Sequence, residues 1–517
     1  MKIFSGVFPI RLGNPVANAE TIIDIINKNN DADIYLFPAY CLEGATCGRL
    51  IDFKYFKEEI EEAIDKLCEF TEDNKKIIVT AAHGHDNIVI RDGDVLKNTT
   101  FMCDGKKVSV SQSVREAFDL LLLPTSMPSY PCIQNDVIEF CAKASLDKKC
   151  SVAVANSGFG ESTADNVFKG FAGIFKNGII VDFMAQDEPE LTCCIQDYAK
   201  ETGLVYARNR AIDYKIPYFG KNEPKRYLSE LFKLQIQALY TRLKSSGISR
   251  VVVNVSGGLD STLALMVASE TMKMLKMPSQ NIIAITQPCF GTGGRTYNNA
   301  KKLMELLNVT SFEIDIKNAV TTHLSDIGAD INNHDVVYEN AQARERAQVA
   351  FDMANKYNAI VMGTGDMSEA ALGFCTFGGD TLGHYNVNAT VPKTVMQHLI
   401  RQLSAENEGE LGQVLLDVVE TPISPELKED QKTEDIVGPY ILHDFIMYYF
   451  AKLHLSKEDI RHYMLATFEE YDDDEIDKWL EVFFKRFKAS RFKRAAACEG
   501  ANLIGFTLPY IPADAEM

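Results

Sequence analysis

The first 210 residues alternate between two hydrophobic patterns. Short apolar runs such as "KIFSGVF", "DIYLFP" and "KKIIVTAA" are typical of buried strands. Apolar residues with helical spacing follow the first run, over residues 16–29. The pattern predicts a domain of layered helices and strands over residues 1–210.

The second half of the chain has a more regular rhythm. An amphipathic helix pattern over residues 227–247 precedes the strand-like run "RVVVNV", and helix and strand patterns then alternate through "NIIAITQP" and "AIVMGTGD". This succession is typical of βαβ units and predicts an α/β domain with a doubly wound, mostly parallel sheet over residues 226–517. Ligands bind such sheets at the carboxyl ends of the strands. Residues 211–225 are irregular and charged, and we expect a linker there.

Two further stretches of the second half differ from this rhythm. Residues 405–435 are acidic and contain proline, so we expect a mobile loop. The last eighty residues have a helical pattern.

Charge and composition exclude some classes of protein. The formal net charge of −19 argues against sequence-independent nucleic-acid binding, which needs a basic surface. The apolar runs are too short to cross a bilayer, and the first residues are too short a run for a signal peptide. Twelve cysteines are scattered without metal-binding spacing. We therefore expect a cytoplasmic protein with free thiols that binds neither membrane nor nucleic acid.

The stretch "NVSGGLDSTLAL" lies between a predicted strand and a predicted helix. Gly257 and Gly258 let the backbone turn tightly and approach a ligand, and the N–H groups at the start of a helix favour an anion. Phosphoryl-transfer loops place a lysine after their glycines, whereas this loop has Asp260. A carboxylate beside phosphate needs a cation between them, and Mg²⁺ takes oxygen ligands from both.

The pattern "SGGxDS" resembles the pyrophosphate loop of the ATP pyrophosphatase families, which release pyrophosphate and transfer AMP. Four further strings look like the synthetase domain of glutamine-dependent NAD synthetases: "FGTGGRTYNNA", "YENAQARERAQ", "GTGDMSEAALGFCTFGGD" and "HYNVNATVPKT". The resemblance covers roughly residues 226–500 and implies an adenine nucleotide alpha hydrolase-like fold. It also implies ATP-dependent amidation of deamido-NAD through an adenylated intermediate, with release of AMP and pyrophosphate.

The resemblance also implies roles for individual residues. Asp260, Glu369 and Lys393 would be catalytic, with Asp260 and Glu369 as magnesium ligands. The ATP-binding residues would be Ser256, Gly257, Gly258, Leu259, Asp260, Ser261, Thr262, Thr364 and Lys393. The deamido-NAD-binding residues would be Asn340, Arg344, Glu369, Phe374, Cys375, Thr376, Phe377 and Lys493.

Some of these roles have alternatives. Arg344 shares a helix face with Asn340 and could meet a phosphate or pair with an acid. The aromatic residues of 374–377 could belong to the core. The segment "CEGANLIG" after Lys493 departs from the family pattern, which leaves that end of the site open.

The first domain resembles the nitrilase-like αββα domain that makes ammonia from glutamine in these enzymes. Such a domain needs a glutamate, a lysine and a cysteine. The glutamate position is Ala39, the lysine position falls near Ser113, and the strand that carries the cysteine is not found. We therefore predict a degenerate glutaminase retained as a scaffold for a homo-oligomer, with ammonia taken from solution or from a separate glutaminase.

Three alternatives stay open at this point. A rearranged glutaminase could use Cys41, Cys47 or Cys132 with Glu43, although moving a catalytic triad intact is geometrically demanding. The chain could adenylate another carboxylate, a base or a tRNA, but its acidic composition speaks against tRNA. It could also be a non-catalytic sensor of pyridine nucleotides. Against this, metal-binding carboxylates that hold no metal would repel the phosphates of the nucleotide.

Overall fold

The computed structural model describes residues 1–110, 117–200, 202–205, 215–219, 224–291, 294–423 and 433–512. The chain divides into two compact units, Met1–Asn209 and Arg210–Met517. All twelve cysteines are free thiols, as the sequence predicts. In the described part of the chain, every helix is too short or too polar to span a bilayer.

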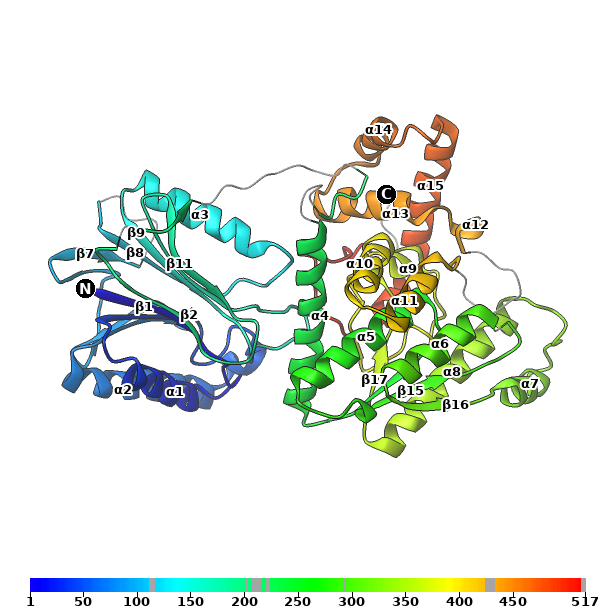
Figure 1. Cartoon of the computed structure of the whole chain (residues 1–517), viewed down its shortest axis with the longest axis horizontal. Coiled ribbons are helices and arrows are strands. Elements are labelled where there is room, and N and C mark those ends of the chain that lie inside the picture. The colour runs from blue at the N-terminus through cyan, green and yellow to red at the C-terminus, as the bar shows by residue number, and fades with distance from the viewer. Residues whose placement is uncertain are drawn as a thin grey trace. The chain divides into compact units, whose positions relative to one another are not determined.

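The first unit is a sandwich of two sheets with helices on both outer faces (Figure 1), which confirms the predicted αββα class. One sheet has the order β12-β1-β2-β3-β4-β5 and the other β13-β11-β10-β9-β8-β7-β6. The strands of the first sheet are β1 (Lys2–Val7), β2 (Ile34–Ala39), β3 (Ile77–Ala82), β4 (His85–Arg91), β5 (Asp94–Val95) and β12 (Thr192–Asp197). Those of the second are β6 (Thr100–Cys103), β7 (Lys106–Ser109), β8 (Leu120–Thr125), β9 (Ser151–Asn156), β10 (Phe171–Lys176), β11 (Ile179–Ala185) and β13 (Leu204–Val205).

Strand alternation builds three apolar layers in this unit. Ile3 and Leu36 point between the sheets, whereas Phe4 and Phe37 point to the outer face under α1 (Pro15–Lys28) and α2 (Lys54–Asn74). A third helix, α3 (Ile133–Asp147), covers the outer face of the other sheet. Because both faces of β2 are covered, all its residues are buried.

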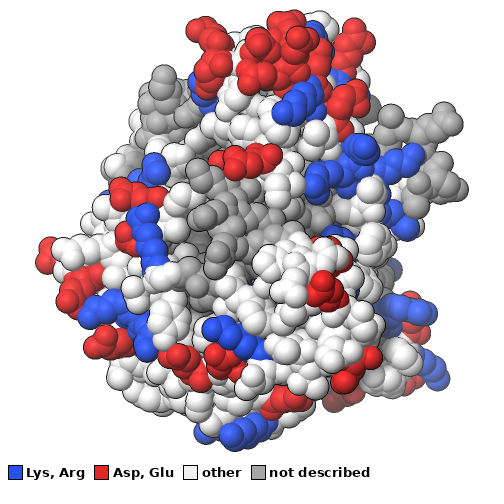
Figure 2. All heavy atoms as spheres, turned by 90° about the vertical axis from the view of Figure 1, so that its right-hand side faces the viewer, with Lys and Arg blue, Asp and Glu red and all other residues white. Residues whose placement is uncertain are grey.

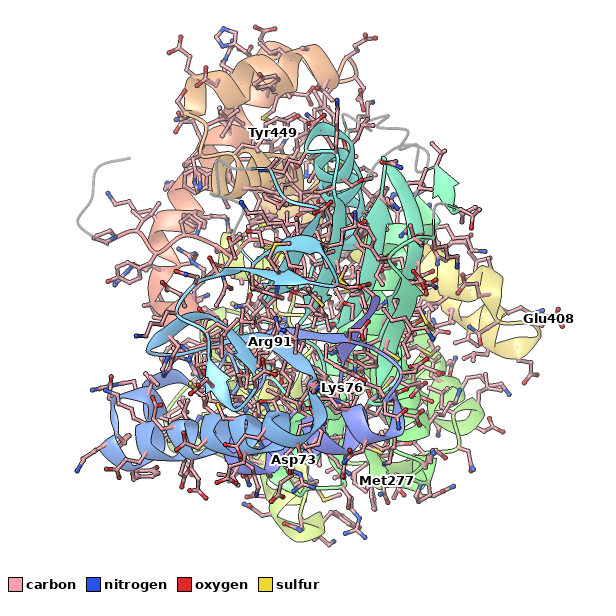
Figure 3. The ribbon with its side chains drawn as sticks, turned by 90° about the vertical axis from the view of Figure 1, so that its left-hand side faces the viewer. Asp73, Lys76, Arg91, Met277, Glu408 and Tyr449 are labelled. Atoms are coloured by element: carbon pink, nitrogen blue, oxygen red, sulfur yellow. The ribbon has the colours of Figure 1, made fainter. Side chains whose placement is uncertain are left out.

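Several side chains join the two sheets, and Arg91 is one of them. Arg91, labelled in Figure 3, ends β4 of the first sheet. Its Nη1 donates to the carbonyl oxygen of Met102 in β6 of the second sheet, at 2.9 Å.

The second unit contains a parallel sheet with the order β16-β15-β14-β17-β18. The chain proceeds outward from β14 to β15 and β16 and then returns to the other side of β14. Such a reversal opens a crevice at the carboxyl end of the central strand. The strands are β14 (Val251–Asn254), β15 (Ile282–Thr286), β16 (Thr310–Glu313), β17 (Ile360–Gly363) and β18 (Tyr385–Asn386).

Helices cover both faces of this sheet, so the predicted doubly wound class is confirmed. Val252, Ile283 and Ile285 pack under α8, and α5 also contacts β14, whose first three residues are all buried. The helices are α4 (Pro224–Ser246), α5 (Leu259–Met274), α6 (Gly294–Leu306), α7 (Lys317–Asp326), α8 (Val336–Tyr357), α9 (Met367–Leu372), α10 (Lys393–Glu406), α11 (Glu410–Glu420), α12 (Thr433–Val437), α13 (Tyr440–Met447), α14 (Lys457–Thr467), α15 (Asp473–Ala489) and α16 (Arg491–Ala495).

The expected mobile loop over residues 405–435 is wrong where the structure describes it. Residues Glu410–Glu420 form α11, which packs against α10 and α6. Its buried residues Leu415, Val418 and Val419 recur with helical spacing, and this amphipathic pattern outweighs the acidic composition. Residues 424–432 of that stretch lie outside the described part.

Charge is unevenly distributed over the second unit. Figure 2 shows acidic side chains gathered at the top of the view, whereas lysines and arginines are interspersed with acids over the rest of that face. The first turn of α15 contributes three exposed acids, Asp473, Asp474 and Glu475.

A buried histidine makes this unit sensitive to acid. The His443 imidazole lies near the rings of Trp479 and Phe483, and its Nε2 donates to the Val437 carbonyl oxygen at 2.6 Å. Burial lowers the pKa of His443 to about 4 from 6.5. The unfolded chain therefore binds a proton first as the pH falls, so stability is complete above pH 6.5 and is lost toward pH 4.

We expect protonation of His443 alone to lower the free energy of unfolding by about 3 kcal/mol as the pH falls from 6.5 to 4. Chemical denaturation at pH 7 and pH 4 should show a smaller acid loss for His443→Gln than for the unchanged protein. The exposed His462→Gln serves as the control. Equal acid losses in the unchanged protein and His443→Gln would refute the assignment.

Candidate active site

The turn between β14 and α5 is shaped by glycine. Gly257 has φ +86°, and a Cβ there would lie 1.9 Å from the carbonyl oxygen of Thr296 in α6. Hydroxyl groups brace the turn, since the Gly258 N–H donates to Ser256 Oγ at 3.1 Å and the Ser256 N–H to Ser261 Oγ at 3.2 Å. The turn is therefore fixed with α5 starting directly behind it.

Three carboxylates meet one buried ammonium beside this turn. Lys393, at the start of α10, has a fully buried side chain. Its Nζ lies 2.7 Å from Asp260 Oδ1, 2.9 Å from Glu369 Oε1 and in an ion pair with Asp366 Oδ2. We call Asp260, Asp366 and Glu369 the acidic triad. Asp260 lies on α5, Asp366 caps the N-terminus of α9, Glu369 lies on α9, and Lys393 begins α10. The fold brings these four residues together.

Burial and mutual repulsion change the protonation of these groups. Burial raises the pKa of Glu369 to about 7 despite the nearby Lys393, and it raises that of Asp366 well above its ordinary value. Burial by itself would lower the pKa of Lys393, but the three carboxylates outweigh it and raise that pKa. The site holds more acid than its single ammonium neutralises.

The donor set fits a hard divalent cation. Among the described residues, these three form the group of potential metal ligands whose atoms all lie within 4.8 Å of one another. Carboxylate oxygens are what Mg²⁺ takes in proteins. The Lys393 ammonium lies between these carboxylates, at the position to which such a cation would be attracted.

A cavity of about 250 Å³ opens above the acidic triad, at the carboxyl ends of β14, β15 and β17. Predicted site residues that line it are Ser256, Gly258, Leu259, Asp260, Ser261, Thr364, Glu369 and Phe374. Gly257 and Thr262 belong to the same turn, and Lys393 contacts the triad without lining the cavity. The structure therefore brings the predicted ATP-binding residues to one place.

The predicted deamido-NAD residues surround the loop after α9. Asn340 on α8 accepts a hydrogen bond from Thr376 Oγ1 at 2.9 Å. Arg344, one helical turn further, donates from Nε to the Phe377 carbonyl oxygen at 3.2 Å. The two roles considered for Arg344 are thus joined by a third, support of this loop.

Lys493 holds the same loop from the other side. Its Nζ donates to the carbonyl oxygens of Gly373 and Cys375 at 2.8 and 2.6 Å. The ring of Phe377 is 44% exposed and packs on Phe492, so Phe377 is not a core residue.

A known protein family matches the part of the chain that carries this site. Residues 232–497, which include the turn, the acidic triad and the loop after α9, match the family described as NAD synthase. The chain belongs to the NAD synthase family.

Individual proteins of known sequence also match this chain. The "Glutamine-dependent NAD(+) synthetase" of Mycobacterium leprae is 38% identical over 305 residues, which cover 53% of this chain and 45% of that protein. The chain thus spans about half the length of the curated relatives it matches at this level of identity.

Two solved structures share the fold along nearly the whole chain. A glutamine-dependent NAD(+) synthetase from Cytophaga hutchinsonii superposes with a TM-score of 0.77 at 16% identity, covering 99% of this chain and 97% of the other. One from Acinetobacter baumannii, in complex with adenosine diphosphate, has a TM-score of 0.70 at 18% identity and covers 98% and 97%.

Sequence reasoning missed three buried polar residues of this NAD synthase site. Asp366 belongs to the acidic triad. Asn388 is fully buried, and its Nδ2 donates to the carbonyl oxygens of Asp260 and Thr364, both at 3.0 Å. Asp444 accepts from Ser368 Oγ at 2.5 Å. Asp366 and Asn388 lie inside the quoted strings that carry the family resemblance, which is the signal that could have found them, whereas Asp444 lies outside those strings.

Asp444 positions the two helices that carry the triad and its ammonium. Besides Ser368 on α9, it accepts from the N–H and Oγ1 of Thr394 on α10, at 2.8 and 2.6 Å. Ser368 Oγ in turn accepts from the Lys393 N–H at 2.9 Å. The buried carboxylate therefore ties α9 to α10 directly behind Glu369 and Lys393.

Replacing Asp444 with asparagine should weaken both stability and the site. The amide leaves buried donors unsatisfied, which costs about 1–3 kcal/mol each. We expect an unfolding free energy lower by about 3 kcal/mol and a kcat lower by about tenfold to a hundredfold, because small shifts of catalytic groups are costly. Denaturation and steady-state rates check this, with the exposed Asp326→Asn as control. A variant with unchanged kcat would contradict the positioning role.

Two cysteines that follow the altered glutamate position of the first unit have buried thiols. Ala39 ends β2 and is buried, while Ser113 lies outside the described residues. Burial raises the pKa of Cys41 to about 12 and that of Cys47 to about 11. The carboxylate of Glu43 is engaged by the His83 N–H at 2.7 Å and by His83 Nδ1 at 2.9 Å.

Proposed function

We propose that this chain is an NAD synthetase that amidates deamido-NAD, with ATP converted to AMP and pyrophosphate. The observation that carries the proposal is the acidic triad with Lys393 beside a glycine turn, at the carboxyl edge of the parallel sheet. Membership of the NAD synthase family and the activity for which the relatives are named support the same reaction.

In this proposal, the turn of residues 256–262 binds the ATP phosphates. Gly257 lets the backbone come close, and the N–H groups at the start of α5 face the negative charge. Asp260 and Glu369, together with Asp366, would hold Mg²⁺. The metal, when bound, neutralises charge on the phosphates and on the departing pyrophosphate.

The remaining residues position the two substrates. Lys393 supplies a positive charge at the phosphates, and Thr364 lines the cavity at the end of β17. The loop of residues 374–377, held by Asn340, Arg344 and Lys493, would bind the dinucleotide and present its nicotinate carboxylate to the α-phosphorus. Catalysis then depends mainly on positioning and on charge stabilisation.

We propose that the nitrogen comes from free ammonia or from a separate glutaminase. Ala39 carries no base, and the buried thiols of Cys41 and Cys47 resist ionisation, which speaks against a rearranged glutaminase that uses either of these two cysteines. The first unit would serve as a scaffold for a homo-oligomer. Free thiols and an acidic composition fit a cytoplasmic enzyme.

A direct comparison of nitrogen sources tests the proposal. Purified protein receives deamido-NAD, Mg²⁺ and ATP with either ammonium chloride or glutamine, and NAD and AMP are measured. We expect NAD with ammonium and at least tenfold less with glutamine. Equal rates would show that the first unit works as a glutaminase, and no NAD from either source would overturn the assignment.

A further inference from the structure

The acidic triad already holds a cation, the ammonium of Lys393. This ammonium is fully buried, contacts all three carboxylates and lies 5.5 Å from the ring centre of Tyr440. The ligand atoms of the triad lie within 4.8 Å of one another, whereas opposite oxygens around Mg²⁺ are roughly 4.2 Å apart. The same space therefore admits the ammonium or the metal, but not both.

We propose that Lys393 and the divalent cation occupy the acidic triad in exchange. Without nucleotide the Lys393 ammonium fills the triad, and it gives up this place when the metal arrives with the ATP phosphates. This exchange rests on the proposed function, because the phosphates are those of the substrate ATP.

The physical reason lies in what happens to a buried charge that loses its partners. A divalent ion alone would drive the ammonium out of the triad and leave it buried without a counter-charge, which is strongly unfavourable. The phosphates supply the missing anion for Lys393 while the carboxylates pass to the metal. Divalent ions and nucleotide are therefore expected to bind together, and divalent ions alone only weakly.

The main chain is fixed in a way that leaves only the side chain to move. The Lys393 N–H donates to the buried Ser368 Oγ at 2.9 Å, and Thr394 is held by Asp444 at 2.6 and 2.8 Å. The exchange thus requires rotation of the lysine side chain and no shift of α10.

Binding of Mn²⁺ in the absence of nucleotide tests this exchange without any turnover. Free Mn²⁺ is measured by electron paramagnetic resonance for the unchanged protein and for Lys393→Met. Lys301→Met, which removes an exposed lysine of α6, is the matched control. We expect Lys393→Met to bind Mn²⁺ at least tenfold more tightly than the other two proteins.

A second variant keeps the test decisive if Lys393→Met fails to fold, which circular dichroism reveals. The double variant Lys393→Gln/Asp366→Asn removes one charge of each sign and should still bind Mn²⁺ more tightly than the unchanged protein. Binding no tighter than in the unchanged protein, for every folded variant, overturns the exchange. Failure of NAD formation with the Mn²⁺ result intact would instead contradict only the proposed function.

Discussion

Replacing Asp260 with asparagine is expected to lower kcat/KM for NAD formation by about a hundredfold to a thousandfold. Asp260 is the triad member that lines the cavity from the glycine turn between β14 and α5, and both its oxygens contact Lys393, at 2.7 and 2.9 Å. The amide loses one negative charge from the group that would hold the metal, and transition-state charge stabilisation of this kind is worth that factor.

Steady-state assays with deamido-NAD, ATP and ammonium measure this loss. Asp326→Asn, at the exposed end of α7, removes the same charge away from the cavity and should keep the rate of the unchanged protein. An Asp260→Asn enzyme within tenfold of the unchanged rate would exclude this carboxylate from catalysis.

The second large effect is expected from Gly257→Ala. A methyl group there meets the Thr296 carbonyl oxygen at 1.9 Å, and φ of +86° is unfavourable for any residue with a Cβ. We expect a loss of about 3 kcal/mol of unfolding free energy, or a displaced turn that no longer binds ATP. Denaturation and calorimetric titration with Mg-ATP distinguish these two forms of damage.

Gly258→Ala provides the matched control for folding. Gly258 has no positive φ, and the nearest atom to an added Cβ would be Ser256 Oγ at 3.3 Å, so this variant should fold with nearly unchanged stability. Equal stability and equal ATP affinity for Gly257→Ala and the unchanged protein would contradict the role of the turn.

The parts of the fold that local patterns determine were predictable from the sequence. The β-branched runs form β14, β15 and β17, and Gly257 and Gly258 form the turn. The acidic composition of residues 405–435 indicates a loop, whereas the helical spacing of Leu415 and Val418 produces α11.

Long-range geometry limited what could be predicted of the site. Asp260 and Lys393 are far apart in sequence, and only the family resemblance placed them together. Asp366 was overlooked for a local reason, since its side chain accepts from the Glu369 N–H at 2.8 Å as an ordinary helix cap. A capping pattern gives no sign that the other carboxylate oxygen pairs with Lys393.

The fate of one oxygen atom tests the central claim most directly. Deamido-NAD labelled with ¹⁸O in its nicotinate carboxylate is incubated with Mg-ATP, ammonium and the enzyme, and the products are analysed by mass spectrometry. Adenylation of the carboxylate predicts one labelled oxygen in each AMP and none in pyrophosphate. Label in pyrophosphate or inorganic phosphate, or ADP in place of AMP, would contradict the account.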